Sequence, residues 1–465
     1  MSQETNSAPV TENKMGTMPI GRLVFNMSLP MMISMLVQAL YNIVDSIFVA
    51  KLSENALTAV SLAFPLQTLI IAVATGTGVG VNALLSKSLG AHKYDEANKI
   101  GINGAVLYAF SYVIFLILGL TIVKPFYMSQ IGNADIEIMD MGVSYLSTVM
   151  IFSFGIFAEI FFERVLTSTG RTIFSMTSQL CGAITNIILD PIMIFGLLGF
   201  PKLGATGAAV ATVVGQCVAA VVAFVCNHKF NHDIKLSFKG YSPDFKIMGT
   251  IYAIGIPSII MQSIGSVMTY AMNRILIGFS STAAAVFGVY FKLQSFFFMP
   301  VFGLNNGITP IIAFNYGAQN RKRMVKTIKV SLITAFCLLF FGFACFEFIP
   351  KVLLGMFSAS DDMLKIGVPA LRIIGVHFLI AWFCIIVGTV FQALGKAVFS
   401  MIVSIMRQLV VLIPAAYILS KLGGLHAVWW AFPIAEVISL TVSTLFLIRF
   451  NRTIISKIPD GSDVL

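Results

Sequence analysis

Long apolar runs alternate with short polar segments along almost the whole chain. A helix needs about 20 apolar residues to cross the hydrocarbon core of a membrane, whereas barrel strands alternate apolar and polar residues over about ten positions. The unbroken runs therefore predict membrane-spanning helices. The twelve expected spans are residues 22–50, 56–85, 100–123, 140–163, 172–198, 204–226, 247–277, 283–312, 325–349, 364–391, 397–419 and 425–448.

The first half of this pattern is repeated in the second half. Residues 30–99 align without a gap with residues 257–326 at a constant offset of 227, and 12 of the 70 aligned positions are identical. In a membrane chain, such a repeat is typical of a transporter whose binding site lies between the repeats. The identities include residues that constrain or relax the backbone: Pro30/Pro257, Gly76/Gly303, Gly80/Gly307 and Gly90/Gly317.

The repeat predicts an all-α integral membrane protein with 12 transmembrane helices in two pseudo-symmetric six-helix lobes. The N-terminal lobe is expected over residues 22–226 and the C-terminal lobe over 247–450. Residues 227–246 form the most polar internal segment and are expected to link the lobes. Residues 1–21 and 451–465 are expected to be tails.

The basic residues indicate how the chain lies in the membrane. Only 11% of the residues are charged and 57% are hydrophobic, as in membrane proteins. Of the 30 Lys and Arg residues, 20 lie on the side of both termini, 6 on the other side and 4 within spans. The positive-inside rule then places both termini in the cytoplasm. The basic run at 321–329 follows a span, so it indicates anchoring to the leaflet rather than nucleic-acid binding.

Acidic residues within spans are the first candidates for a functional site. Placing a charged side chain inside a membrane is energetically unfavourable, so such residues are rare and usually functional. Asp45 has Tyr41 and Asn42 one helical turn away, and Asp190 has Asn186 one turn away. Both aspartates are expected at a similar depth, where they could bind a proton or a small cation. The alternative is that each aspartate only caps or hydrogen-bonds a neighbouring helix.

Two further acids, Glu159 and Glu163, lie near the expected end of the fourth span. They could extend the same site, with Glu163 lining its cavity, or a local ion pair with Arg164 could satisfy them. Two prolines within spans, Pro30 and Pro191, each remove a backbone donor and predict a bend, which could be a hinge or static. Gln67, repeated as Gln294, is a further candidate for the cavity wall.

Basic residues within spans occur only in the second half: Arg274, Lys292, Arg372 and Arg407. Lys292 and Arg407 are expected near the middle of the membrane. They could line a water-filled cavity and set the charge of the substrate, or they could pair internally, for example with Glu436.

Other chemistry finds little support in the sequence. The glycines at 76–80 do not match a phosphate-binding loop, and their spacing favours close helix packing. The six cysteines lack metal-ligand spacing. No catalytic or ATP-binding motif is present, so we expect a transporter rather than an enzyme, without a cofactor and driven by an ion gradient or by a partner.

The chain resembles the multidrug and toxic compound extrusion (MATE) transporters, particularly the MepA-like bacterial branch, over residues 20–450. The resemblance rests on VDSIFV at 44–49, LGA at 89–91, NIILDPIMIFG at 186–196 and QALG at 392–395. It implies two six-helix lobes in a V shape and export of cationic amphipathic drugs in exchange for H⁺ or Na⁺. It also implies a bacterial plasma (inner) membrane, a lipid bilayer and drug molecules as partners, and function as a monomer.

The resemblance further implies an ion site in the N-terminal lobe at Asp45, Asn186, Asp190 and Thr212, where Na⁺ is the one metal expected. In some accounts of the family, ion binding bends the first helix near the proline matched by Pro30. The NorM branch has acids in helices 7 and 10, but residues 259–267 and 378–390 contain none here. Coupling is therefore expected in the N-terminal lobe. The alternative function is a flippase for a lipid-linked precursor, whose pyrophosphate would need the four embedded bases in one cavity.

Overall fold

In a computed structural model of the chain, the described residues are 13–131, 136–237, 241–357 and 359–460, and within them the regular structure is helical. Ten helices are long and apolar enough to cross a membrane, and two bent helix pairs raise the number of spans to as many as 12. This agrees with the twelve expected spans. The N-terminal half contains α1 (Lys14–Thr17), α2 (Ile20–Leu52), α3 (Glu54–Gly90), α4 (Tyr94–Thr121), α5 (Val123–Ile131), α6 (Ile136–Ile151), α7 (Phe154–Ser168), α8 (Thr172–Phe195) and α9 (Ala205–Phe230).

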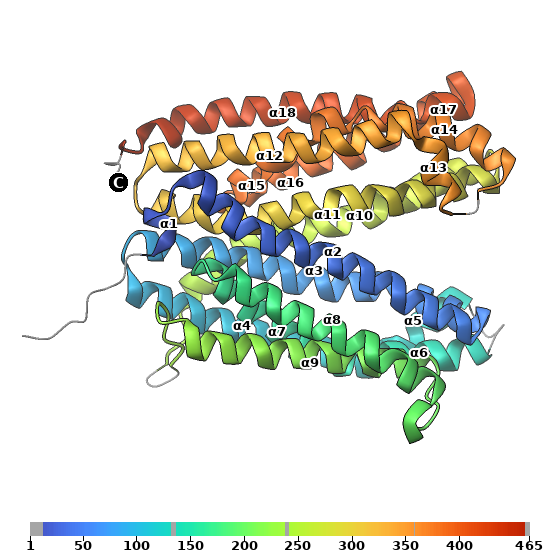
Figure 1. The fold of residues 1–465 in the computed structure, drawn as a ribbon, viewed down its shortest axis with the longest axis horizontal. Coiled ribbons are helices and arrows are strands. Elements are labelled where there is room, and N and C mark those ends of the chain that lie inside the picture. Colours follow the sequence, from blue (N-terminus) through green and yellow to red (C-terminus); the bar gives the residue numbers. More distant parts are fainter. Residues whose placement is uncertain (1–12, 132–135, 238–240, 358, 461–465) are drawn as a thin grey trace, which may run out of the picture.

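The C-terminal half repeats this arrangement, and Figure 1 shows the two halves as two groups of roughly parallel helices. Its spans are α10 (Phe245–Ile277), α11 (Ser281–Gly317), α12 (Arg321–Phe348), the pair α14 (Asp361–Gly375) and α15 (Phe378–Ala393), then α16 (Ala397–Ile405), and α18 (Ala431–Thr453). A π-helical segment, Met406–Leu412, joins α16 to α17 (Ile413–Val428). The short helix α13 (Pro350–Gly355) precedes α14.

The repeat fixes where matching helices begin. Ser53 accepts a hydrogen bond from the Ala56 amide at 3.0 Å at the start of α3. Ser280 accepts the same bond from the Ala283 amide, also at 3.0 Å, at the start of α11. A serine in this position satisfies one of the free amides of the first turn. Both serines and both alanines are related by the offset of 227.

Two spans are broken, which the hydropathy pattern did not indicate. α6 and α7 meet at 41°, and α14 and α15 meet at 48°. At the breaks, the amides of Ser153 and His377 bond to carbonyls three residues earlier, at Met150 and Ile374. The tighter three-residue bonds interrupt the α-helical ladder. Pro30 and Pro191, by contrast, lie inside helices that remain continuous.

The lobes meet through α2 against α11 and α3 against α10. A Cβ atom added to Gly76 would lie 2.9 Å from the Ile259 amide nitrogen, and one added to Gly303 would lie 2.6 Å from the Met32 amide nitrogen. Because residues 76 and 303, and 32 and 259, are both related by 227, these are the same contact in the two halves. The repeated glycines therefore allow close backbone packing between the lobes.

Helix α1 and the last turns of α18 lie at the same end of the molecule (Figure 1). Within the expected tail 1–21, the described residues make contacts there: Arg323 donates to the carbonyls of Met15 and Met18 at 3.1 and 2.7 Å, and Asn13 donates to the Thr169 carbonyl at 3.1 Å. α1 thus contacts both lobes. At the other terminus, Ile458 is buried within the expected tail 451–465.

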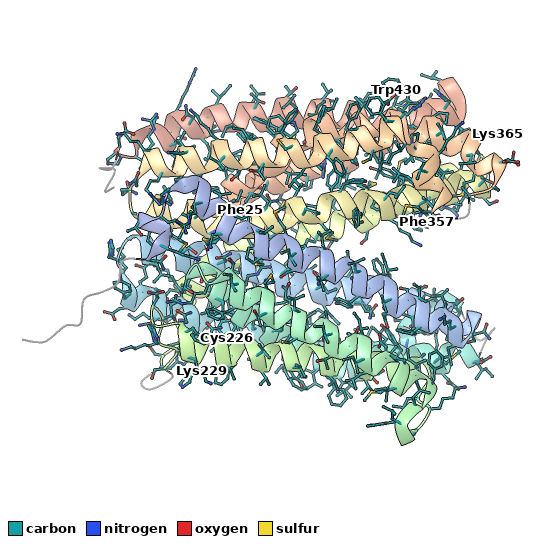
Figure 2. The ribbon with its side chains drawn as sticks, in the orientation of Figure 1. Phe25, Cys226, Lys229, Phe357, Lys365 and Trp430 are labelled. Carbon is teal, nitrogen blue, oxygen red and sulfur yellow. The ribbon has the colours of Figure 1, made fainter. Side chains whose placement is uncertain are left out.

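The connection between the lobes is shorter than residues 227–246, because α9 and α10 extend into this segment. Asp233 pairs with Arg171, and the Lys235 amide donates to Asn98 at 2.8 Å, so the segment rests on the N-terminal lobe. Figure 2 shows Lys229 at the end near the termini and Lys365 at the opposite end. Large apolar side chains such as Trp430 are exposed between those ends, as expected for contact with lipid.

Candidate functional site

Four polar residues from three helices meet inside the N-terminal lobe. α8 packs against α2 and α9, which brings Asn186 and Asp190 to Asp45 on α2 and to Thr212 on α9. Asp190 is 0% exposed. The Asn186 amide nitrogen lies 3.4 Å from Asp190 Oδ1 and 3.4 Å from Thr212 Oγ1, so it donates toward both. The four residues expected at the ion site therefore lie together.

The two aspartates face each other. Their carboxyl groups are within reach of a side-chain hydrogen bond, which requires a proton on one of them. Asp45 Oδ1 and Asp190 Oδ2 are both buried without a donor among the described residues. Two carboxylates side by side repel each other unless a proton or a cation lies between them. This geometry can therefore hold either one.

A cavity of about 110 Å³ adjoins this site and extends toward the end of the lobe that carries the termini. It lies between α2, α3, α7, α8 and α9, and its apolar wall includes Met35, Ile71 and Ile160. A cavity with several polar partners has room and hydrogen bonds for water. Its polar lining consists of Ser34, Gln38, Tyr41, Thr75, Glu159, Glu163, Arg164, Gln179, Asn186, Thr212 and Gln216.

Glu163 lines the cavity without the expected ion pair. α7 continues to Ser168 instead of ending near Arg164, and consecutive residues of a helix point in different directions. Glu163 Oε2 accepts a hydrogen bond from Gln179 on α8 at 2.7 Å. Arg164 also lines the cavity, and it donates to Asn306 of the C-terminal lobe at 3.1 Å. Neither side chain pairs with the other in the described part of the chain.

Sequence reasoning missed Gln38, Gln179 and Gln216 as cavity residues. A signal for Gln179 was present, because Gln179, Asn186 and Asp190 stand at i, i+7 and i+11 on one face of α8. Ser34, Gln38, Tyr41 and Asp45 follow the same spacing on α2. These two polar stripes face each other across the cavity.

Two of the expected cavity residues lie elsewhere. Asn42 is exposed, because it follows Tyr41 on α2 and consecutive residues of a helix point in different directions. Gln67 donates to the Tyr145 hydroxyl at 2.8 Å, between α3 and α6. Neither belongs to the lining of the cavity beside Asn186.

The embedded bases of the C-terminal lobe have separate environments. Arg407 pairs with the buried Glu436 at 3.3 Å, and Arg372 donates to the Glu347 carbonyl at 3.1 Å. Lys292 is exposed with its Nζ 6.0 Å from the centre of the Phe357 ring, which lies at the end opposite the termini (Figure 2). Arg274 is also exposed. A pyrophosphate site would need these groups together, so their separate partners argue against the flippase alternative.

Comparison with known proteins places these features in a family. The sequence profile of the MatE family matches residues 30–192 and, a second time, residues 257–418. The chain is 27% identical to the multidrug export protein MepA of Staphylococcus haemolyticus, over 94% of this chain and 96% of the relative.

Solved structures agree with this similarity. A structure described as the outward-facing conformation of a multidrug resistance MATE family transporter matches with a TM-score of 0.89 and 25% identity, over 97% of this chain and 99% of the other. A transporter of the same superfamily from Pyrococcus furiosus, described as having a binding pocket of reverse polarity, matches with a TM-score of 0.88 and 25% identity, also over 97% and 99% of the two chains.

Proposed function

The chain belongs to the MatE family of multidrug export transporters, and we propose that it exports cationic amphipathic molecules in exchange for H⁺ or Na⁺ bound at Asp45 and Asp190. The observation that carries the proposal is the pair of facing carboxyl groups, each with a buried oxygen that has no donor among the described residues. Such a pair binds a cation strongly only while its geometry is kept, so binding can be linked to a change of conformation.

The oxygens present suit either ion. Two carboxylates, the Asn186 amide and the Thr212 hydroxyl offer the hard oxygen ligands that Na⁺ accepts, by analogy with other hard cations. A single proton shared between Asp45 and Asp190 would equally remove their repulsion. The site is complete within one chain, in keeping with a transporter that works as a monomer.

In the proposed cycle, the ion enters from the side opposite the termini and binds at Asp45 and Asp190. Ion binding weakens the binding of the exported molecule, which leaves to that side. The lobes then rock about the glycine contacts of α2, α3, α10 and α11, the ion is released on the side of the termini, and a new molecule enters. The placement of basic residues puts that side in the cytoplasm. An exchange of this kind requires that ion and substrate favour different states.

The test is ethidium efflux from cells that lack their own pumps, with the H⁺ and Na⁺ gradients collapsed separately. Collapse of one gradient should stop efflux and so identify the ion. Asp45→Asn and Asp190→Asn should each reduce gradient-driven efflux at least tenfold, because an amide neither takes up a proton as a carboxylate does nor neutralises the charge of a bound cation. Asp140→Asn, at an exposed position on α6, is the matched control and should be active. Variants at 45 and 190 that express normally and still export against a gradient would refute the assignment.

A further inference from the structure

The cavity beside the aspartate pair leads to a second pair of acids. Glu159 and Glu163 lie one turn apart on α7, and both line the cavity. Asp190 and Gln179, the partner of Glu163, are separated by 11 residues of α8, or about 16 Å of helix. Asp45 and Ser34 on α2 are likewise 11 residues apart. The cavity therefore contains the glutamate pair, and at its other end it reaches Asn186, which donates toward Asp190.

The unsatisfied atoms along this cavity are mostly acceptors. Asn186 Oδ1, Gln179 Oε1 and Glu163 Oε1 are buried and have no donor in the described part of the chain, like the two aspartate oxygens. An unsatisfied buried acceptor costs about 1–3 kcal/mol. Water or a cation would satisfy these oxygens, whereas the buried Nε of Arg164, which also lines the cavity, has no acceptor among the described residues and needs one such as water.

Tyr41 links the two pairs. It lines the cavity together with Gln38, and it lies within electrostatic range of Glu159 as well as of Asp45. A hydroxyl can accept one proton and donate another. Tyr41 is therefore placed to pass a proton between the pairs through water.

The other polar and titratable side chains around Glu159 and Glu163 come from four helices. Arg164 on α7 donates from one guanidinium nitrogen to Asn306 at 3.1 Å, while its Nε is buried without an acceptor among the described residues. The Tyr108 hydroxyl on α4 donates to the Ala74 carbonyl at 2.7 Å. Cys217 on α9 is near Glu159. Gln179 on α8 donates to Glu163. With these groups engaged or neutral, the two glutamates are the groups left to exchange a proton.

We propose that Glu159 and Glu163 form a second proton-binding site, through which a proton bound at Asp45 and Asp190 reaches the side of the termini. In each transfer, the protonated aspartate loses a proton to a cavity water, and a water loses a proton to a glutamate carboxylate. One proton moves and no other bond changes. The proposal rests on the proposed function, and it assigns H⁺ as the coupling ion.

The size of the cavity favours a proton over the exported molecule. Sites for drug-sized ligands usually have volumes of about 300–1,000 Å³, and this cavity has about 110 Å³. It can hold several waters. A chain of waters between acids is the occupant that fits.

The test uses purified protein in liposomes with ethidium as substrate and pyranine inside as a pH indicator. Two reactions are compared: ethidium movement driven by a pH gradient, and exchange of labelled for unlabelled ethidium without net proton movement. The double variant Glu159→Gln/Glu163→Gln should slow gradient-driven transport and pyranine response at least tenfold and leave exchange within twofold of wild type. The single variant Glu163→Asp keeps a carboxyl group that can carry a proton, so its gradient-driven transport should be faster than that of the double variant.

The controls separate this proposal from the proposed function. Glu96→Gln, at an exposed surface pair, should behave as wild type. If the double variant keeps wild-type gradient-driven transport, the second site is refuted while the aspartate site stands. If the double variant loses exchange as well but folds normally by size exclusion, the glutamates hold the substrate and the relay is wrong. If Asp45→Asn keeps gradient-driven transport, the proposed function itself fails.

Discussion

Replacing Gly90 or Gly317 by alanine should force the lobes apart at the end that carries the termini. A Cβ atom on Gly90 would lie 2.7 Å from the Phe314 carbonyl carbon, and one on Gly317 would lie 2.8 Å from the Lys87 carbonyl carbon. Ordinary van der Waals contact begins at 3.4 Å. Backbone carbonyls inside a helix cannot rotate away, so the strain has to be relieved by separation of the helices.

The size of the effect follows from the cost of overpacking. One added methyl group in a closely packed contact costs about 1–3 kcal/mol. A change of about 2 kcal/mol alters the ratio of two states about thirtyfold. Because Gly90 meets Phe314 as Gly317 meets Lys87 (90/317 and 87/314 are both related by 227), the two variants should have similar effects. Each should shift the population toward a state that is open on the side of the termini.

Spin labels at the exposed Lys93 and Lys322, in protein without native cysteines, would report the distance between the lobes by double electron–electron resonance. Both variants should show a new population at longer distance and slower ethidium efflux. Gly249→Ala is the control, because a Cβ at that position on α10 meets nothing within 4 Å. Wild-type distance distributions and efflux in both Gly90→Ala and Gly317→Ala would show that this contact does not set the lobe positions.

Two further predictions concern contacts outside the ion site. Glu436→Ala removes the carboxylate 3.3 Å from Arg407 and should destabilise the protein by about 3–5 kcal/mol. The double variant Arg407→Leu/Glu436→Leu should have a melting temperature near that of wild type. Equal losses of stability in the two variants would contradict this. Arg323→Ala removes the donor to the Met15 and Met18 carbonyls and should cost about 1–3 kcal/mol at α1. Limited proteolysis should then cleave before α2 more rapidly, and unchanged cleavage would show that α1 is held by other contacts.

The sequence allowed the spans, the repeat and the grouping of Asn186 with Asp190 to be predicted, because each leaves a local signal. Hydropathy reports the length of a span, and Asn186 and Asp190 stand one turn apart on the same helix. The breaks before α7 and α15 leave no such signal, since both are made by backbone bonds at Ser153 and His377 in apolar surroundings.

The pairing of Arg407 with Glu436 was among the expected alternatives and is confirmed, but the partners of Glu163 and Arg164 could not be predicted from the sequence. Glu163 and Arg164 are neighbours in the chain, which suggested a shared ion pair. The continuous helix turns them toward different helices, and their partners, Gln179 and Asn306, are set by tertiary packing. The repeat suggested close packing at the glycines, but only the structure shows that Gly76 and Gly303 pack against the opposite lobe.

α2 connects the ion site with the contact between the lobes. It carries Asp45, and about 20 Å further along the same helix it presents Met32 to Gly303 of α11. Its counterpart α10 makes the matching contact at Ile259 but has the buried Met272 in place of Asp45. The C-terminal lobe instead keeps its buried charge neutral by the pairing of Arg407 with Glu436. A change in the charge at Asp45 acts on α2 and, through Asp190, on α8 of the same lobe. Because α2 also forms an interface built equally from both lobes, the proposed ion site in one lobe could in this way move the two lobes together.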